Sequence, residues 1–316
     1  MNLDWLDAFL LFGVFEVVMV IGLALLLHLQ IGLVRIANFG VVGFWGLGAY
    51  AFGASFTKID WSLGEPWPFL ISVVVGTIVA GLGGLLVGWL IADLDTDGVL
   101  VGTLGFATAV VILVTTQDGL TGGALGMSGL RFPFDIGKTK ANELLWFGIL
   151  VLVVGAIFYY VARVHRSPYG RLLIAVGDNE PLARSLGKPA FRAKLWLFAI
   201  ASAGMGLLGI MSATMFHLLI PEAIGINVTL AAIVALVLGG TARVWGAVVG
   251  AILTVGLFEI LVQFYLPFPR SWYTQAIPVL REMVFGAALI IVLLVRPLGI
   301  LGDMRRDKLV RRMHRG

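Results

Sequence analysis

Long apolar runs separated by short polar segments dominate the chain. A helix needs roughly 20 apolar residues to cross the ~30 Å hydrocarbon core of a bilayer, and nine runs approach that length. They cover residues 8–28, 36–56, 69–92, 98–116, 144–162, 195–215, 228–242, 244–266 and 277–301. The pattern predicts an all-α, polytopic transmembrane bundle of about nine spans, forming a single domain over residues 1–316.

The two runs around residue 243 are separated only by the stretch LGGTARVWGAVVGA. This stretch fits a turn between two spans, and it also fits an irregular break inside the bilayer, where non-helical backbone is tolerated if protein or a cavity surrounds it. The sequence leaves both alternatives open, so broken helices are among the expected features.

Composition agrees with a membrane protein. Hydrophobic residues make up 59% of the chain and charged residues 13%, and the mean hydropathy is +1.01, far above that of an ordinary soluble domain. The absence of cysteine excludes disulfides and thiolate metal sites. Gly76, Ala80, Gly84 and Gly88 recur every four residues, so we expect another helix of the chain to pack closely against that face.

Basic residues gather in two clusters. The first is Arg163, Arg166, Arg171, Arg184, Lys188, Arg192 and Lys194, and the second is Arg305, Arg306, Lys308, Arg311, Arg312 and Arg315. Such clusters face the cytoplasm in membrane proteins, and this explanation requires no nucleic acid partner. We therefore expect a cytoplasmic loop at 163–194, a basic cytoplasmic tail at 303–316 and an external N-terminus, in a cytoplasmic (inner) membrane. The N-terminus lacks the basic region of a cleavable signal peptide, and we expect it to be retained.

Two external segments do not resemble ordinary loops. Residues 116–143 form a long glycine-rich connection, which is either a flexible linker or a docking surface for an outside partner. Residues 216–229 are also expected outside, with a helix beginning after Pro221.

Catalytic and cofactor-binding patterns are missing from the sequence. The histidines lack metal-site spacing, and no phosphate-binding loop of the form GxxxxGK[ST] occurs. The sequence therefore predicts no catalytic residue, no metal site and no cofactor in this chain. Any ATP and its magnesium would be bound by another subunit.

The polar stretch between Pro168 and Pro189 predicts a short interfacial helix. Asp178 is the expected N-cap, Pro181 lies in the first turn and Gly187 ends the helix. Its apolar side, Leu182, Ala183 and Leu186, must be buried against something. One alternative is a protein cleft, and the other is a helix in the headgroup layer with its arginines on anionic lipid.

This stretch also carries a resemblance to a known family. The segment RSPYGRLLIAVGDNEPLARSLGKPAFRAKLWLFAIASAGMGLLG resembles the cytoplasmic signature of the LivH/LivM family, the permeases of branched-chain amino acid ABC importers, and in particular its LivM-like members. Four further stretches match in the same order. They are IANFGVVGFWGLGAY, LTGGALGMSGL, AAIVALVLGGTARVWGAVVGAIL and VRPLGILG.

The resemblance implies a permease that pairs with a second, LivH-like permease, two cytoplasmic ATP-binding subunits and an external solute-binding protein. A loop of such permeases inserts into the ATPase. By the resemblance, the residues that couple this chain to the ATPase are Asp178, Asn179, Glu180, Ala183, Leu186 and Gly187.

Polar residues within apolar spans are candidates for the translocation path, because they are costly in lipid unless they face a partner or water. They are Glu16, Asn38 and Glu259. Each could instead cap a helix or pair within the bundle.

The expected function is import of branched-chain or related amino acids, with urea or short amides as alternative substrates. A self-contained secondary transporter with broken helices is the alternative from another class. An intramembrane enzyme is disfavoured, because no set of acid, base or metal ligands converges.

Overall fold

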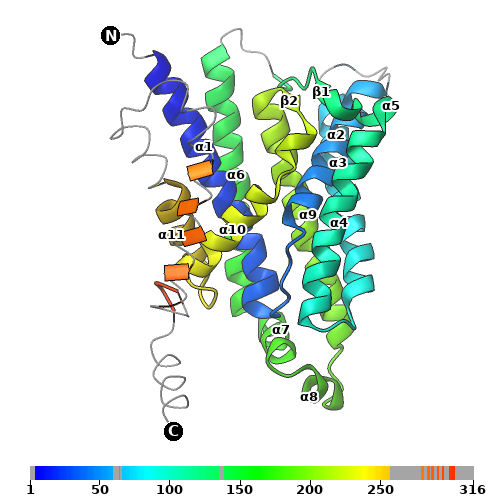
Figure 1. The fold of residues 1–316 in the computed structure, drawn as a ribbon, viewed down its shortest axis with the longest axis vertical. Helices are drawn as coiled ribbons and strands as arrows, with labels where there is room; N and C mark the ends of the chain where they lie inside the picture. Colours follow the sequence, from blue (N-terminus) through cyan, green and yellow to red (C-terminus); the bar gives the residue numbers. More distant parts are fainter. Residues whose placement is uncertain are drawn as a thin grey trace.

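The computed structural model describes residues 4–59, 64, 66–134 and 139–256 and short pieces between 279 and 302. In the described part, six helical segments are long and apolar enough to cross a membrane. The long elements are α1 (Asp4–Leu27) with its π-helical continuation η1 (His28–Leu33), α2 (Val41–Lys58), α3 (Trp67–Ile91), α4 (Thr96–Thr116), α6 (Thr139–Arg166), α9 (Ala190–Phe216), α10 (Ile226–Gly239) and α11 (Val244–Ala251) with η4 (Ile252–Gly256). The predicted all-α polytopic bundle is confirmed (Figure 1).

The centre of the bundle is built from α2, α3 and α9, which pack against one another more extensively than any other trio. The small residues of α3 make this possible. A Cβ added to Gly84 would lie 2.5 Å from Ser202 Cβ, and one added to Gly76 would lie 2.5 Å from the Gly48 carbonyl oxygen. Real Cβ atoms do not approach so closely, so only small residues allow this contact. The predicted close packing on this face of α3 is confirmed.

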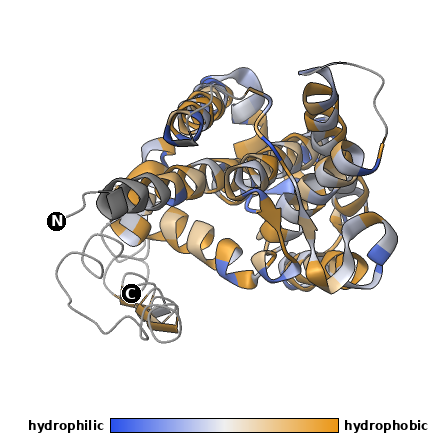
Figure 2. Ribbon diagram, turned by 90° about the horizontal axis from the view of Figure 1, so that it is seen from above, coloured by the Kyte–Doolittle hydropathy of each residue, from blue (hydrophilic) through white to orange (hydrophobic). Residues whose placement is uncertain are grey.

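The outer face of α3 is apolar and exposed. Leu70, Val74, Ile78, Leu82 and Leu86 are each between 45% and 60% exposed and follow one another every four residues. A soluble protein rarely leaves an apolar stripe of this length in water, whereas lipid solvates it. Seen from above, hydrophobic colouring dominates the described helices (Figure 2).

The helices on either side of residue 243 form a tight antiparallel hairpin. A Cβ on Gly239 would lie 1.7 Å from the Gly246 carbonyl oxygen, and a Cβ on Gly250 would lie 1.7 Å from that of Ala235. The chain reverses at Gly240, whose φ of 109° is in the region that favours glycine. The break between α10 and α11 is thus a turn between two helices that contact backbone to backbone.

The two segments expected outside meet at one end of the bundle. After α5 (Asp118–Thr121) and η2 (Gly123–Leu125), strand β1 (Met127–Ser128) pairs antiparallel with β2 (Leu218–Leu219), which precedes η3 (Pro221–Ala223). The His217 ring nitrogen Nδ1 lies 2.6 Å from the Leu130 carbonyl oxygen. The described portion of 116–143 that precedes residue 131 is therefore held in place and is not a flexible linker.

The segment expected in the cytoplasm lies at the opposite end. It forms α7 (Pro168–Asp178) and α8 (Glu180–Ser185), below the ends of α3, α4 and α6 (Figure 1). The predicted loop 163–194 and the two predicted external segments thus lie at opposite ends of the bundle. The tail at 303–316 lies outside the described residues.

Candidate functional site

The polar end of the bundle is organised around α8, whose limits differ by one residue from the prediction. Asp178 is the last residue of α7, and Asn179 is the N-cap of α8, its Oδ1 accepting the Leu182 N–H at 3.0 Å. The predicted N-cap at Asp178 is wrong, because α7 continues in helical conformation through that residue. Asn179 has φ −156° and ψ 94°, the extended backbone that an N-cap requires.

The end of α8 agrees with the prediction. Gly187 has a φ of +73°, and its N–H donates to the Arg184 carbonyl at 2.9 Å. The Lys188 N–H donates to the Ala183 carbonyl at 3.0 Å. Glycine adopts this left-handed conformation without a Cβ penalty, so the helix stops where the sequence predicts.

The apolar residues of α8 separate onto different faces. Ala183 is 4% exposed and belongs to the core of the subunit, whereas Leu182 is 56% exposed and Leu186 is 69% exposed. The three residues therefore do not form one side within this subunit, and burial of Leu182 and Leu186 against another molecule stays a prediction. Leu182, in the first turn of α8, and Leu186, at its end, are thus not covered by the described part of this subunit.

Charged side chains hold α8 against the ends of α3 and α9. Lys194 Nζ donates to Glu180 Oε2 at 2.8 Å and to the Ala92 carbonyl, just after α3, at 2.6 Å. Arg184 contacts Glu180 Oε1 at 2.8 Å and Asp93 Oδ1 at 3.0 Å. Hydrogen bonds to Asp93 and, after it, Glu180 raise the pKa of the Arg184 guanidinium.

A second feature at this end is the irregular segment between η1 and α2, residues 34–40, called here the η1–α2 segment. The sequence predicts a span beginning at residue 36, but helix α2 begins only at Val41. Within the segment Arg35 has a φ of 59°, a left-handed conformation that is uncommon for a side chain of this size.

Buried polar side chains satisfy the backbone of the η1–α2 segment. Asn38, fully buried, donates to Gln30 Oε1 at 2.8 Å and accepts the Gly40 N–H at 2.8 Å. The Phe39 N–H donates to Thr103 Oγ1 of α4 at 3.1 Å, and the Val42 N–H donates to Thr229 Oγ1 of α10 at 3.1 Å. Buried non-helical backbone needs such partners, because neither water nor a helical neighbour pairs with it there.

The η1–α2 segment touches the corner between α7 and α8. Arg35 forms an ion pair with Asp178 through a guanidinium nitrogen and Oδ1. A Cβ added to Gly177 would lie 2.7 Å from the Leu33 carbonyl oxygen and 3.0 Å from Val34 Cα, so the two backbones are in direct contact there.

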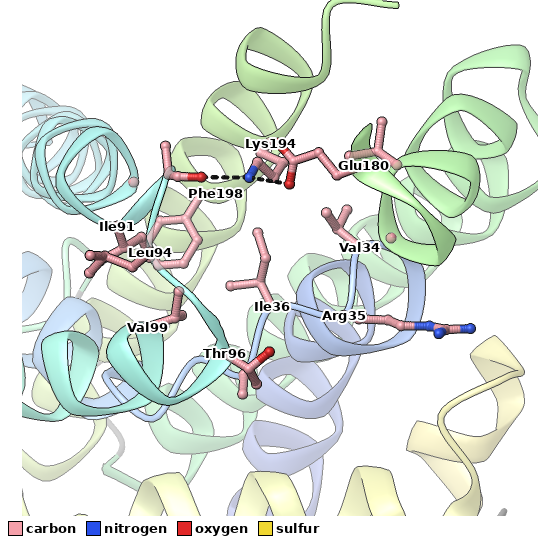
Figure 3. Close-up of a pocket in the computed structure, with 15 residues that line it drawn as sticks. Val34, Arg35, Ile36, Ile91, Leu94, Thr96, Val99, Glu180, Lys194 and Phe198 are labelled. Atoms are coloured by element: carbon pink, nitrogen blue, oxygen red, sulfur yellow. Dashed lines mark hydrogen bonds and ion pairs between the residues drawn. The ribbon is translucent and has the colours of Figure 1, made fainter. Parts of the chain in front are cut away.

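A cavity of about 260 Å³ lies between these elements. Val34, Ile36 and Phe198 line it with the ends of α3 and α4, and the Glu180–Lys194 ion pair closes one side (Figure 3). Both charges in that wall are already paired with each other, so the cavity offers a ligand no free charge from them.

The predicted path residues occupy different places. Asn38 lies in the core, in the hydrogen bonds described above. Glu16 is half-buried on α1, and Glu259 lies outside the described residues. Among the described residues, no group of three or more histidine, aspartate or glutamate side chains is placed to hold a metal ion.

Sequence reasoning missed Arg35 and Gly177, and it named Asn179 among the coupling residues without predicting that it is the N-cap of α8. Arg35 is a single charge between two apolar runs, and its proximity to a polar residue 143 positions later has no local signature. Asn179 carries a recognisable signal, since Asn followed by a proline in the first turn is a common helix start.

Comparison with known proteins extends over most of the chain. The family described as "Branched-chain amino acid transport system / permease component" matches residues 9–293. The permease protein LivM of the high-affinity branched-chain amino acid transport system of Escherichia coli K12 is 28% identical over 311 residues, covering 91% of this chain and 68% of that protein. The corresponding Salmonella typhimurium protein is 27% identical over the same shares.

A second group of relatives is more distant. The autoinducer 2 import system permease protein LsrC of Salmonella paratyphi B is 26% identical over 230 residues, which cover 71% of this chain and 63% of LsrC. No solved structure matches the chain significantly.

Proposed function

The chain belongs to the family of branched-chain amino acid transport permease components, and from this premise we propose that it is the membrane subunit of an ATP-driven importer for branched-chain or related amino acids. It is a multi-pass ABC transporter permease, a transport subunit and not an enzyme, as are the relatives that it matches. Our proposal concerns three further properties: the solute that is transported, the partner subunits, and the residues that couple the chain to ATP hydrolysis.

In the proposed assembly, the chain lies in the cytoplasmic membrane with α7 and α8 in the cytoplasm and the β1–β2 end outside. A second permease completes the translocation path, two further subunits bind ATP with magnesium, and an external protein delivers the solute. Asn38, Glu16 and Glu259 remain the proposed polar residues of the path.

The observation that carries the coupling proposal is the form of α8. Its base is held by Asn179, Ala183 and the Glu180–Lys194 pair, whereas Leu182 and Leu186 project from the bundle. A helix held against the bundle on one face, with exposed leucines on another, fits into a cleft of a second protein and passes on its motion. A helix resting on lipid would not need the charged contacts to α3 and α9.

Gly187 offers a test of this proposal. At a φ of +73° valine is strained, while asparagine adopts this conformation readily. In the described part of the chain no atom lies within 4 Å of where a Cβ would stand, so both variants differ from wild type mainly in backbone preference. Gly187→Val should leave the permease inserted but uncouple ATP hydrolysis from uptake or release the ATPase subunits. Gly187→Asn is the matched control.

Reconstituted uptake and ATP hydrolysis are measured on the same vesicles. Normal coupled uptake by Gly187→Val would contradict the coupling role of α8. Purification of a transport-active chain without any ATPase subunit would favour the self-contained secondary transporter instead.

The solute is open to a separate test. By its name, LsrC belongs to an autoinducer 2 import system and LivM to a branched-chain amino acid system; the longer match favours the amino acids. A binding screen on the associated solute-binding protein, with leucine, isoleucine, valine, urea and short amides, checks this. Binding of urea or amides alone would overturn the amino acid proposal.

A further inference from the structure

We propose that Arg35 and Asp178 connect the coupling helix α8 to the η1–α2 segment, so that motion imposed on α8 moves the point where the first two membrane helices are joined. This inference rests on the proposed function, and it names the positioning residues through which α8 would act. Neither residue needs to touch the transported solute.

The covalent path from α8 to this pair is short. Asp178 directly precedes Asn179, the N-cap of α8. A rotation or displacement of α8 therefore moves the Asp178 backbone directly, because no flexible residues lie between Asp178 and the N-cap. The Asp178 carboxylate is bound to the Arg35 guanidinium, 143 residues earlier in the chain.

A second contact makes the junction stiff. Gly177 places its backbone directly against Leu33 and Val34, with no side chain between them. Packed backbone transmits displacement better than long flexible side chains do. The ion pair and this contact lie on consecutive residues of α7, so together they restrain both the position and the direction of the η1–α2 segment.

The segment itself can pass the displacement on. Arg35 adopts a left-handed conformation that persists only where surrounding contacts hold it. Further along, Phe39 is bonded to Thr103 of α4, and Val42 to Thr229 of α10. A shift at Arg35 thus reaches two other membrane helices, α4 through Phe39 and α10 through Val42 in the first turn of α2.

The cavity beside the junction provides room for such a shift. Val34 and Ile36 line it from the η1–α2 segment, and Val176 and Gly177 line it from α7. A close-packed interior resists displacement, whereas side chains that border a cavity of about 260 Å³ have no protein atoms against them on that side.

The salt bridge is exposed, with 57% and 43% of the two side chains accessible to solvent. Exposed pairs contribute little to stability. Variants of this pair should therefore fold normally, and any effect on transport should report on its role in the cycle.

The test uses charge reversal in the complete reconstituted transporter. Arg35→Asp and Asp178→Arg are each expected to lower the solute transported per ATP hydrolysed by about fivefold or more, the range of a typical coupling energy, at unchanged melting temperature. The double variant restores the ion pair with its two charges exchanged. It should therefore recover most of the solute transported per ATP hydrolysed. Arg192→Asp, which reverses an exposed charge near the start of α9, is the matched control.

Two milder substitutions of Arg35 keep the inference testable if a charge-reversal variant fails to fold. Arg35→Lys keeps the charge and should retain most coupling, whereas Arg35→Gln should lose it. Failure of the double variant to recover, or equal behaviour of Arg35→Lys and Arg35→Gln, would overturn the inference.

The outcome also separates this inference from the proposed function. If Gly187→Val uncouples the transporter and the charge reversals do not, α8 is a coupling helix that acts through other contacts, and the Arg35–Asp178 connection is wrong. If neither change affects coupling, the coupling role of α8 fails, and this inference fails with it.

Discussion

The side-chain amide of Asn38 donates to Gln30 Oε1 at 2.8 Å in the buried core, across the point where the first membrane helix ends and the second has not begun. The Asn38 side-chain oxygen Oδ1 accepts the Gly40 N–H at 2.8 Å. One side chain thereby closes a polar turn that would otherwise leave backbone groups unpaired away from water.

Replacing Asn38 by leucine should destabilise the permease. The change leaves Gln30 Oε1 and the Gly40 N–H without these partners, which costs about 2–4 kcal/mol together. Thermal unfolding in detergent measures the effect. Asn227→Leu, at an exposed position near the start of α10, is the control. Loss of uptake with an unchanged melting temperature would instead support Asn38 as a residue of the translocation path.

Gly84→Leu should lower the melting temperature or the yield of folded protein. The first added carbon already meets Ser202 at 2.5 Å, and overpacking costs about 1–3 kcal/mol. Gly105→Leu on α4 is the control, because among the described residues nothing lies within 4 Å of its Cβ position. Equal stability of the two variants would mean that α3 and α9 can separate without cost.

Leu186→Glu should weaken the association with the ATPase subunits while leaving the isolated permease intact. The side chain is 69% exposed, so a charge there is solvated in the free subunit but would be buried without a partner in an apolar cleft. Leu125→Glu at the opposite end, 88% exposed, is the control. Co-purification of the ATPase measures the effect, and equal recovery with both variants would speak against a docking role for Leu186.

The proposed orientation predicts different labelling at the two ends. The sequence contains no cysteine, so single cysteines can be introduced without background. In intact cells, Ser185→Cys in α8 should be protected from a membrane-impermeant thiol reagent, and Leu125→Cys should react. The reverse pattern would invert the topology, and the positive-inside argument would then fail for this chain.

The membrane helices were predictable from sequence because their cause is local. Each requires a run of apolar residues long enough for the bilayer, and a run such as 98–116 corresponds closely to α4, which covers Thr96–Thr116. The end of α8 was predictable for the same reason, since a glycine that adopts positive φ stops a helix whatever surrounds it.

The site depended on contacts that no local pattern reveals. Asp178 and Asn179 are both good N-caps by residue type, which is why the sequence led to Asp178. In the folded chain α7 continues through Asp178, whose carboxylate binds Arg35, and Asn179 becomes the cap. The late start of α2 was missed similarly, because residues 36–40 are apolar enough for a helix, but their backbone binds the side chains of Asn38 and Thr103 instead.

By itself, the sequence determined the class of protein, most of its membrane helices and the polar segment on which its proposed function depends, since hydrophobicity, charge and turn residues act over a few residues. Tertiary structure decided which helix faces with small residues pack together and how strands β1 and β2 pair. It also decided how α8 is joined to the η1–α2 segment. These features depend on residues up to 143 positions apart, and such pairs are selected only when the whole bundle packs.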